Sequence, residues 1–476
     1  MAADWTRLPR QESQGERITR RTAERVEKLT PAGDYGVLVP FLGEELMVGT
    51  DLYDGMGWSH YRFGLADGQG RIVVDPVYDG IRVASFENSV GADDLPVYIL
   101  SQGDPAQGQC GTVLYGLAAL DGSWCTDVTY VMAAAIEKDE FVLIDRDGMA
   151  WLCDLEGHLK NCGFSRPLLA PYGGFWDDMM PRVSAPLAEM GFGEDRCLLN
   201  FHTGQILSPP ADLDSCVNWR YCGGGLMPAR SQKGPYGYLD SSGNWALPPA
   251  YIDAYGFIGN YAQVDLGGRS CIIDRQGRAA LTPSGALRQT WCSGRVYYLD
   301  IDYIDHTIHA IYNAALEPVD LPAVGCVPEE TSANLSWYDQ AGQGWHWDGE
   351  IIQAIPDGLL PHSARHGALQ ILCSEDDRCG LYDYDREAWV LPMSDHRIEA
   401  VADVVTGEAC WMQMLDDEHF TVYNSDGQAI AISKPPLIGY NSLRVNGLLP
   451  VRDDRWSGIV DETGQWLLRI ALPADE

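Results

Sequence analysis

A short run of carboxylate and imidazole side chains is the densest group of chemically useful residues in this sequence. It contains Asp300, Asp302, Asp305, His306 and His309. Asp300 and Asp302 alternate along a predicted strand and share one face, and the residues that follow are typical of a hairpin tip. Oxygen and imidazole ligands of this kind hold divalent cations. Because no calcium-loop or zinc spacing accompanies them, we interpret the group first as a polar hairpin and only second as a metal site.

A second set of carboxylates recurs along the chain, each three residues before a glycine. An Asp that bonds the backbone of a tight turn, followed by a left-handed glycine, explains this pattern fully. The dense alternation of Asp and Asn that a calcium loop requires is missing. We therefore predict structural turn residues, of which the clearest pairs are Asp67 with Gly70, Asp240 with Gly243, Asp274 with Gly277, and Asp461 with Gly464.

Motifs for catalysis are absent, including G-x-S-x-G, the P-loop and the dinucleotide fingerprint. Paired carboxylates for glycoside hydrolysis stay open, since among 68 acidic residues some pair will always lie close enough. Trp345-His346-Trp347 is one segment that can form a stacking platform for sugar rings, although such residues are more often core. We expect no catalytic residue, no bound cofactor and no enzyme.

The turns that carry these aspartates separate short apolar strands. In Tyr236–Tyr251 an aromatic strand leads into Asp-x-x-Gly, a second apolar strand, a Pro and a Tyr. The marker glycine recurs from Gly70 to Gly464 in about eleven units with a mean spacing of about 39 residues. Each unit is predicted to be an antiparallel sheet of three or four strands, which must stack on its neighbours to bury its faces.

The expected fold is therefore all-β, a tandem repeat of small antiparallel sheets. Such units suit β-propeller blades, although eleven exceed the roughly four to eight blades that are usual. Two smaller rings or an open solenoid-like array fit that number better than one ring. We expect repeats in 32–284 and 346–476, with degenerate repeats or a boundary in 285–345. Function is expected where units depart from the pattern, as in 285–350.

The first 31 residues differ from the rest. Ile18, Thr22, Val26 and Leu29 fall on one helical face before Thr30-Pro31, which predicts a short helix in an N-terminal leader, residues 1–31. No apolar run is long enough to span a membrane, and no signal peptide is recognisable at the first residues. We expect a cytoplasmic protein, or an extracytoplasmic one if a signal has been removed.

The net charge of −35 limits the partners. A field of this sign repels phosphate backbones and anionic lipids, so nucleic acid is not an expected partner. A solvated, soluble surface is the first interpretation, and a docking surface for a basic partner or a mimic of nucleic acid is the second. The 13 cysteines include no C-x-x-C. We expect them to fill the core as free thiols, which favours a reducing compartment.

The repeated pattern of glycine, aromatic residue, Asp-x-x-Gly, apolar strand, Pro and Tyr resembles the bacterial WG repeat. Tyr236–Val264 matches it best, Gly64–Phe86 matches next, and residues 458–468 match its first half. Many proteins with this repeat resemble secreted or lipid-anchored proteins. The resemblance implies a repeat scaffold, and it brings no catalytic residues with it.

Three functions follow as hypotheses. The first is a non-catalytic scaffold that binds a protein, with a glycan as another potential ligand, through loops on rigid stacked sheets. The alternative is a carbohydrate-active enzyme with acidic residues in a propeller funnel. The third is an acidic inhibitor or nucleic-acid mimic. An enzyme should gather carboxylates with perturbed pKa values from several units, whereas a scaffold should show an exposed aromatic patch and no such cluster.

Overall fold

The computed structural model describes most of the chain, and the described residues form strands and turns. Residues Thr6–Arg7 form a short strand, and the predicted helix at 18–29 lies outside the described residues. The described ranges are 6–7, 36–50, 57–88, 91–103, 113–135, 139–147, 149–161, 187–190, 197–200, 205–216, 226–292, 295–302, 307–319, 335–338, 343–347, 352–356, 358–363, 365–416, 419–434 and 444–472.

Eleven antiparallel sheets occupy these ranges, and each is built almost entirely from strands that follow one another in sequence. The first is β2 (Leu38–Thr50), β3 (Gly57–Asp67) and β4 (Ile72–Tyr78), and the second is β5 (Gly80–Asn88), β6 (Gly91–Gly103) and β7 (Val113–Ala119). The third is β8 (Met132–Ala135), β9 (Glu140–Ile144), β10 (Ala150–Asp154) and β11 (His158–Asn161), and β1 (Thr6–Arg7) pairs with the edge of β11.

Three further sheets lie between Leu187 and Leu281. They are β12 (Leu187–Met190), β13 (Cys197–Asn200) and β14 (Gln205–Leu207); β15 (Leu213–Cys216), β16 (Met227–Ser231), β17 (Tyr236–Leu239) and β18 (Trp245–Tyr251); and β19 (Asp253–Ala254), β20 (Tyr261–Asp265), β21 (Ser270–Asp274) and β22 (Ala279–Leu281).

Five sheets complete the array. The first two are β23 (Ala286–Cys292), β24 (Arg295–Asp302) and β25 (Thr307–Asn313); and β26 (Leu335–Tyr338), β27 (Gly344–Trp347) and β28 (Ile352–Ala354). The others are β29 (Leu359–Pro361), β30 (Leu369–Ser374), β31 (Cys379–Asp383) and β32 (Ala388–Ser394); β33 (Ile398–Ala402), β34 (Ala409–Met414), β35 (Phe420–Tyr423) and β36 (Ala429–Ser433); and β37 (Leu449–Arg452), β38 (Trp456–Val460) and β39 (Trp466–Ala471).

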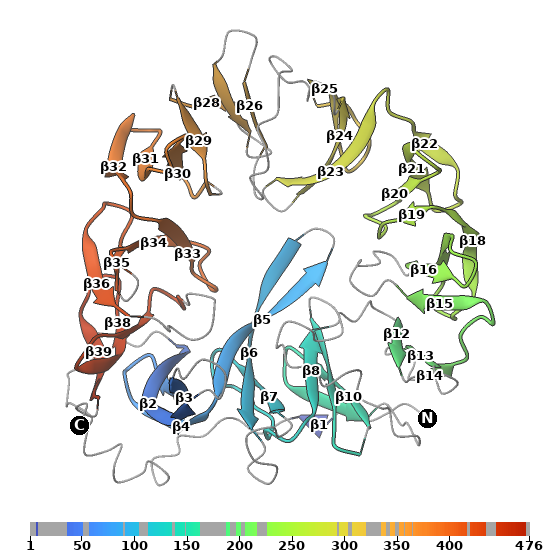
Figure 1. Cartoon of the computed structure of the whole chain (residues 1–476). Helices are drawn as coiled ribbons and strands as arrows, with labels where there is room; N and C mark the ends of the chain where they lie inside the picture. Colours follow the sequence, from blue (N-terminus) through green and yellow to red (C-terminus); the bar gives the residue numbers. More distant parts are fainter. Residues whose placement is uncertain are drawn as a thin grey trace.

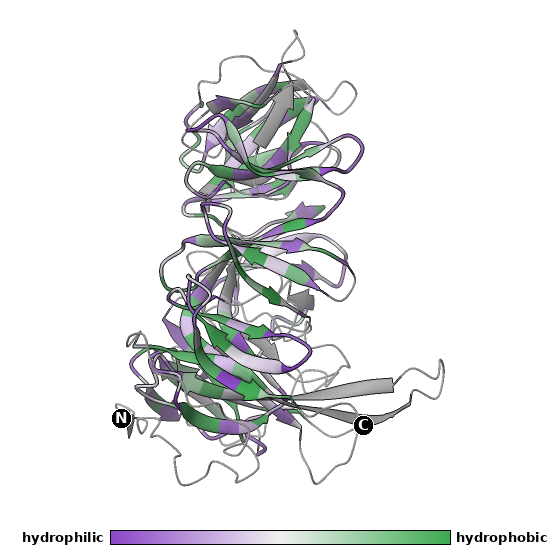
Figure 2. Cartoon of the chain, turned by 90° about the vertical axis from the view of Figure 1, so that its left-hand side faces the viewer, coloured by the Kyte–Doolittle hydropathy of each residue, from purple (hydrophilic) through white to green (hydrophobic). Residues whose placement is uncertain are grey.

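The sheets follow one another around a single ring, with strands such as β29 and β33 towards its centre and β32 and β36 at its outside (Figure 1). Seen from the side, the ring is thinner than it is wide, and hydrophobic segments lie along the strands (Figure 2). The predicted all-β array of small antiparallel sheets is thus confirmed. Of the arrangements that the sequence left open, the structure has one propeller-like ring.

The ring closes because its first sheet packs on its last. Phe41 and Leu65 of the first sheet share one buried core with Ile459 and Leu468 of the last. A sheet with two apolar faces must bury both of them, and at the ends of an array only the opposite end offers a matching face. This long-range contact is the reason that neither two rings nor an open array forms.

Each Asp-x-x-Gly turn is held by its aspartate. Asp240 Oδ1 accepts the N–H groups of Ser242 at 2.8 Å and Asn244 at 3.0 Å, and Gly243 has φ +76°. Asp67, Asp274 and Asp461 each accept the same two N–H groups, two and four residues further on. These eight turn residues therefore stand in the hairpins where the sequence places them.

The turn glycines also touch the neighbouring sheet. A Cβ at Gly464, where φ is +82°, would lie 2.4 Å from the carbonyl oxygen of Ile430 in the preceding sheet. A Cβ at Gly70 would lie 2.0 Å from the carbonyl oxygen of Leu467. The last sheet therefore contacts the first in the same way that each preceding sheet contacts the next. A glycine at this position thus permits both the turn and the close approach of two sheets.

Two degenerate units keep the turn without the glycine. Leu316 has φ +63° and follows Asn313, whose Oδ1 accepts the N–H groups of Ala315 and Glu317. Glu387 has φ +47° in the unit that begins with Asp383. A positive φ is strained for a residue that has a Cβ. The strands on either side of the turn therefore hold Leu316 and Glu387 in this conformation.

Two cysteines depart from the expected free thiols. Cys373 and Cys379 face each other across β30 and β31 with their Cα atoms 4.1 Å apart, and they form a disulfide. The hairpin brings together two residues whose sequence spacing gave no sign of pairing. Cys125, Cys153, Cys197, Cys271 and Cys410 are free thiols in the described part of the chain, and Cys153, Cys271 and Cys410 are buried.

The buried thiols should resist alkylation until the protein unfolds. Burial raises the pKa of Cys153 to about 12 and that of Cys410 to about 11. At pH 8 the thiolate, which is the reactive form, is then rarer than roughly one part in a thousand. Mass spectrometry after iodoacetamide should find both unmodified in native protein and modified in urea. Labelling of Cys153 within minutes in native protein would contradict this burial.

Candidate functional site

Of the residues predicted as a weak metal site, the structure describes Asp300, Asp302 and His309, and these three do not form a ligand group among the described residues. Asp300 is buried at 3% exposure, and its two carboxylate oxygens accept the N–H groups of Ser284 and Gly285, each at 2.7 Å. It thereby fixes the entry to β23. Asp302 is half-buried and His309 is exposed, while Asp305 and His306 lie outside the described residues.

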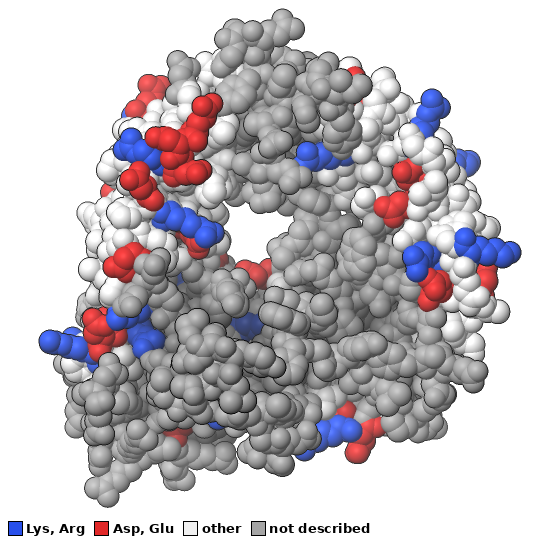
Figure 3. Space-filling model, in the orientation of Figure 1, with Lys and Arg blue, Asp and Glu red and all other residues white. Residues whose placement is uncertain are grey.

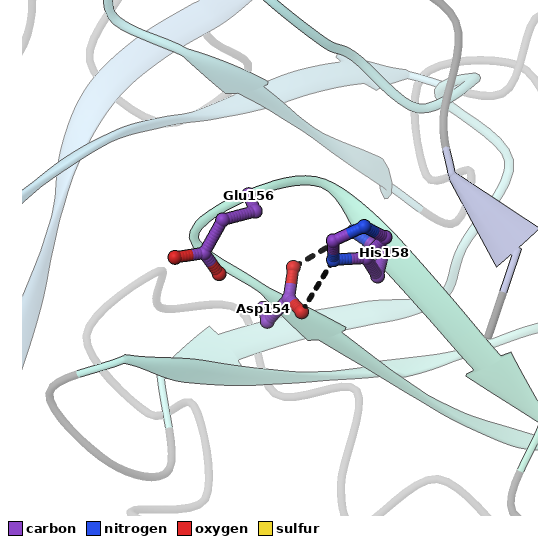
Figure 4. A group of neighbouring side chains, drawn as sticks. All are labelled: Asp154, Glu156 and His158. Carbon is purple, nitrogen blue, oxygen red and sulfur yellow. Dashed lines mark hydrogen bonds and ion pairs between the residues drawn. The ribbon is translucent and has the colours of Figure 1, made fainter.

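Another group of potential metal ligands sits on the turn between β10 and β11. Ligand atoms of Asp154, Glu156 and His158 all lie within 4.8 Å of one another (Figure 4). Asp154 Oδ1 accepts the backbone N–H of His158 at 2.7 Å, and Asp154 Oδ2 lies 2.8 Å from His158 Nδ1. Glu156 is exposed and makes no contact with the other two in this view.

The same contact recurs at other turns with an arginine in place of the histidine. Arg71 Nε donates to Asp67 Oδ2 at 2.7 Å, four residues apart like Asp154 and His158. Arg278 Nε donates to Asp274 Oδ2 at 2.8 Å. His158 therefore occupies the position of a turn-stabilising side chain, and the repeat explains it without a metal ion.

A pocket of about 530 Å³ lies between two consecutive sheets, in the loops that join their first and second strands. Arg365, His366 and Gly367 precede β30 on one side, and Thr406, Gly407 and Glu408 precede β34 on the other. Leu369, Ala409, Trp411 and Ser425 complete the lining. Loops held by rigid strands are common places for binding sites.

The aromatic part of the pocket is buried. Trp411 is 0% exposed, and the ring of His366 meets it edge to face with centroids 5.7 Å apart. Burial lowers the pKa of His366. The imidazole is therefore neutral at pH 7 and adds no positive charge to the pocket.

A buried carboxylate fixes the loop on the β34 side. Asp403 is 2% exposed, and its oxygens accept the N–H groups of Val405, Thr406, Asn446 and Gly447 at 2.6–2.9 Å. Arg444 Nε lies 3.4 Å from Asp403 Oδ2. This carboxylate joins two sheets and holds Thr406 at the edge of the pocket.

Sequence reasoning did not find this pocket, which lies outside the expected range of 285–350. No catalytic or ligand motif marks its residues. The signal that was present is positional, because Arg365-His366-Gly367 and Thr406-Gly407-Glu408 are polar, glycine-containing tripeptides at matching places in adjoining repeats. Equivalent loops of neighbouring repeats lie on one side of such an array.

The tryptophan-rich segment that suggested a sugar platform belongs to the core instead. Trp347 is 3% exposed and packs edge to face on Tyr297 with centroids 4.4 Å apart. His346 is 1% exposed and lies next to Gln370 of the following sheet, with Nε2 atoms 3.2 Å apart. His346 and Trp347 therefore join sheets, and Trp345 is the half-buried member of the segment.

Comparison with protein families gives two matches in the chain. The family described as WG containing repeat matches residues 63–91 and 236–269. These are the two units in which the resemblance is clearest, and the predicted resemblance to the WG repeat is confirmed at these two places. No curated protein matches the chain. No helix in the described residues has the length and apolar character that crossing a membrane requires.

Similarity to solved structures is low. A eukaryotic initiation factor shares 8% identity over 86% of this chain and 96% of its own, with a TM-score of 0.35. BamB from Moraxella catarrhalis shares 10% over 74% and 89%, with a TM-score of 0.23. The computationally designed Ika8 protein shares 12% over 71% and 94%, with a TM-score of 0.27. Nothing about the function of this chain follows from values this low.

Proposed function

We propose that this chain is a non-catalytic scaffold that binds a protein partner through the loops around the pocket between β30 and β34. The observation that carries the proposal is the pairing of this half-open pocket with an apolar side chain at its edge. Val405 is 51% exposed and directly precedes Thr406 of the lining. Pockets bordered by exposed apolar side chains are common anchor points in protein interfaces.

The state of the carboxylates supports a scaffold over a glycoside hydrolase. The pKa of Asp274 is lowered by the hydrogen bond from Arg278, that of Asp376 by the bond from Ser374, and that of Asp454 by the bond from Lys434. A general acid in glycoside hydrolysis needs the opposite shift, which keeps its proton at neutral pH. These three groups are suited to structural contacts.

The sheet β29–β32, which forms one side of the pocket, has an acidic surface that can select among protein partners. On the face that Figure 3 draws, acidic side chains gather over the sheet β29–β32, and an opening lies near the centre of the ring. Exposed acids of this sheet are Glu375, Asp376, Asp377, Asp385, Glu387 and Asp395. Charges at the rim of an interface steer the approach of a partner and select against partners of like charge.

Replacing Val405 by glutamate should weaken the partner's binding by tenfold or more while leaving stability unchanged, because the side chain is exposed. The matched control is Ile432→Glu, which changes a 58% exposed residue on the outer strand β36. The partner is identified by capture from the native host, and the purified pair is then measured by calorimetry.

Loss of binding in Val405→Glu with full binding in Ile432→Glu would support the proposal. Equal binding by the two variants, or turnover of a glycan by the wild-type protein at a rate that Val405→Glu leaves unchanged, would contradict it. Thermal unfolding of both variants tests that the fold is intact.

A further inference from the structure

Arg365 is unusual among the arginines near the surface of this acidic protein. Other arginines contact a carboxylate either at a repeat turn, as Arg71 does with Asp67, or between strands and loops, as Arg62 does with Asp79. Arg365 is half-buried and lines the pocket, yet no carboxylate among the described residues lies within 4.0 Å of its guanidinium. A half-buried charge is costly to leave unpaired, so an anionic group at this place would be stabilising.

The guanidinium of Arg365 is held in position by uncharged groups. Its Nε donates to the carbonyl oxygen of Gly367 at 2.6 Å, and its Nη1 donates to Gln353 Oε1. Its Cζ lies 5.1 Å from the ring centroid of Tyr384. An arginine that is positioned before the ligand arrives loses little side-chain entropy when it binds.

The support under Arg365 continues into the core between two sheets. Tyr384 OH donates to Gln370 Oε1 at 2.8 Å, and Gln370 Nε2 donates to the carbonyl oxygen of Ser363 at 3.0 Å. Gln370 is 0% exposed and Tyr384 is 7% exposed. The ring beneath the guanidinium is therefore fixed, and the Nη2 side of the arginine has no bond to a described residue.

The other titratable groups that line the pocket carry no positive charge, so Arg365 is the group that attracts an anionic ligand. His366 is neutral because burial lowers its pKa. Glu408 is exposed, and its Oε2 lies 3.9 Å from Arg444 Nη2, which reduces its repulsion of an anion. The remaining net charge of the protein is screened beyond about 8–10 Å at physiological salt.

We propose that Arg365 anchors a carboxylate group of the partner's polypeptide, either an Asp or Glu side chain or a C-terminal carboxylate. This proposal rests on the proposed function and names the chemistry that the pocket recognises. Guanidinium and carboxylate match in geometry and form charge-assisted hydrogen bonds, which gives direction as well as affinity. Thr406 and Ser425 supply hydroxyl groups that line the same pocket.

The test compares a carboxylate with its amide on the full-length protein. Saturation-transfer NMR measures binding to the wild type, to Arg365→Gln and to Arg386→Gln. The ligands are inorganic phosphate, N-acetyl-aspartate and N-acetyl-asparagine, the last two with the α-carboxyl group blocked as a methylamide so that they differ only in the side-chain acid or amide. Arg386 is an exposed arginine of the same sheet that pairs with Asp383 and Asp426, and it serves as the matched control. Thermal unfolding of each variant accompanies the binding measurements.

We expect N-acetyl-aspartate to bind at least tenfold more tightly than N-acetyl-asparagine, with this preference lost in Arg365→Gln and kept in Arg386→Gln. Equal affinity for acid and amide, or a preference that survives in Arg365→Gln, would overturn the proposal. Tighter binding of phosphate than of the carboxylate at Arg365 would overturn it as well.

The two proposals fail in different ways. If the purified partner binds Arg365→Gln as tightly as the wild type but loses affinity for Val405→Glu, the scaffold function stands and the carboxylate anchor is wrong. If N-acetyl-aspartate binds through Arg365 but no protein partner depends on Val405, the carboxylate site stands and the scaffold function is wrong.

Discussion

Replacing Gly464 by alanine is expected to destabilise the protein by about 2–5 kcal/mol, because two separate costs add. A left-handed backbone costs a residue with a Cβ about 1–2 kcal/mol. The new Cβ would also lie 2.4 Å from the carbonyl oxygen of Ile430, where backbone cannot move aside without parting two sheets. Overpacking of this kind adds about 1–3 kcal/mol.

The matched control for this substitution is Gly259→Ala. Gly259 has φ +59°, and a Cβ there would meet no atom within 4 Å. It should therefore lose only about 1–2 kcal/mol, the conformational part of the effect. Urea unfolding of both variants separates the two costs. If Gly464→Ala were no less stable than Gly259→Ala, the close approach of neighbouring sheets at the turn would be refuted.

Replacing Asp403 by alanine should cost about 3–5 kcal/mol, because Asp403 accepts four backbone N–H groups and lies beside a buried arginine. The N–H groups of Thr406 and Gly447 would lose their acceptor, and Arg444, 6% exposed, would keep a charge without its nearest partner. Removing one member of a buried ion pair commonly costs this amount. Chemical denaturation measures the loss.

Asp426→Ala is the control for Asp403→Ala. Asp426 is 65% exposed and pairs with Arg386 at 3.3 Å, so its removal should change stability by no more than about 1 kcal/mol. Nuclear magnetic resonance of Asp403→Ala should also show altered amide signals in both 403–408 and 444–448. A stability within about 1 kcal/mol of the wild type would mean that the two sheets do not depend on this carboxylate.

The local part of the fold could be predicted because it depends on neighbours in sequence. Asp240 and Gly243 lie three residues apart and determine one hairpin, so a pattern of residue types is sufficient to recognise it. The number of units followed from counting such turns. The resemblance to the WG repeat was clearest where both strands around the turn were intact, at 63–91 and 236–269.

The features that the sequence did not predict depend on residues far apart in the chain. Gly70 meets Leu467 only because the ring closes, and no local pattern distinguishes that contact from a free turn. The disulfide of Cys373 and Cys379 depends on the register of one hairpin. The pocket depends on how two sheets stack, so His366 and Trp411 become neighbours although they belong to different repeats.

The predicted metal site also shows that a local pattern does not contain the contacts made by residues outside it. Asp300 and Asp302 do alternate along β24 as the pattern indicated. What the pattern did not contain is the position of Ser284 and Gly285, whose N–H groups occupy both oxygens of Asp300. These two bonds give Asp300 a structural role at the start of β23 that the sequence pattern alone did not indicate.

The contact of Gly70 with Leu467 joins the first and last sheets, and it also affects how the ring opens and closes. The first and last sheets belong to one polypeptide, so each meets the other at a high effective concentration whenever the contact between them opens. Reclosure within the same chain then outpaces capture of the exposed faces by another molecule. The covalent connection through all the other sheets therefore favours the closed ring.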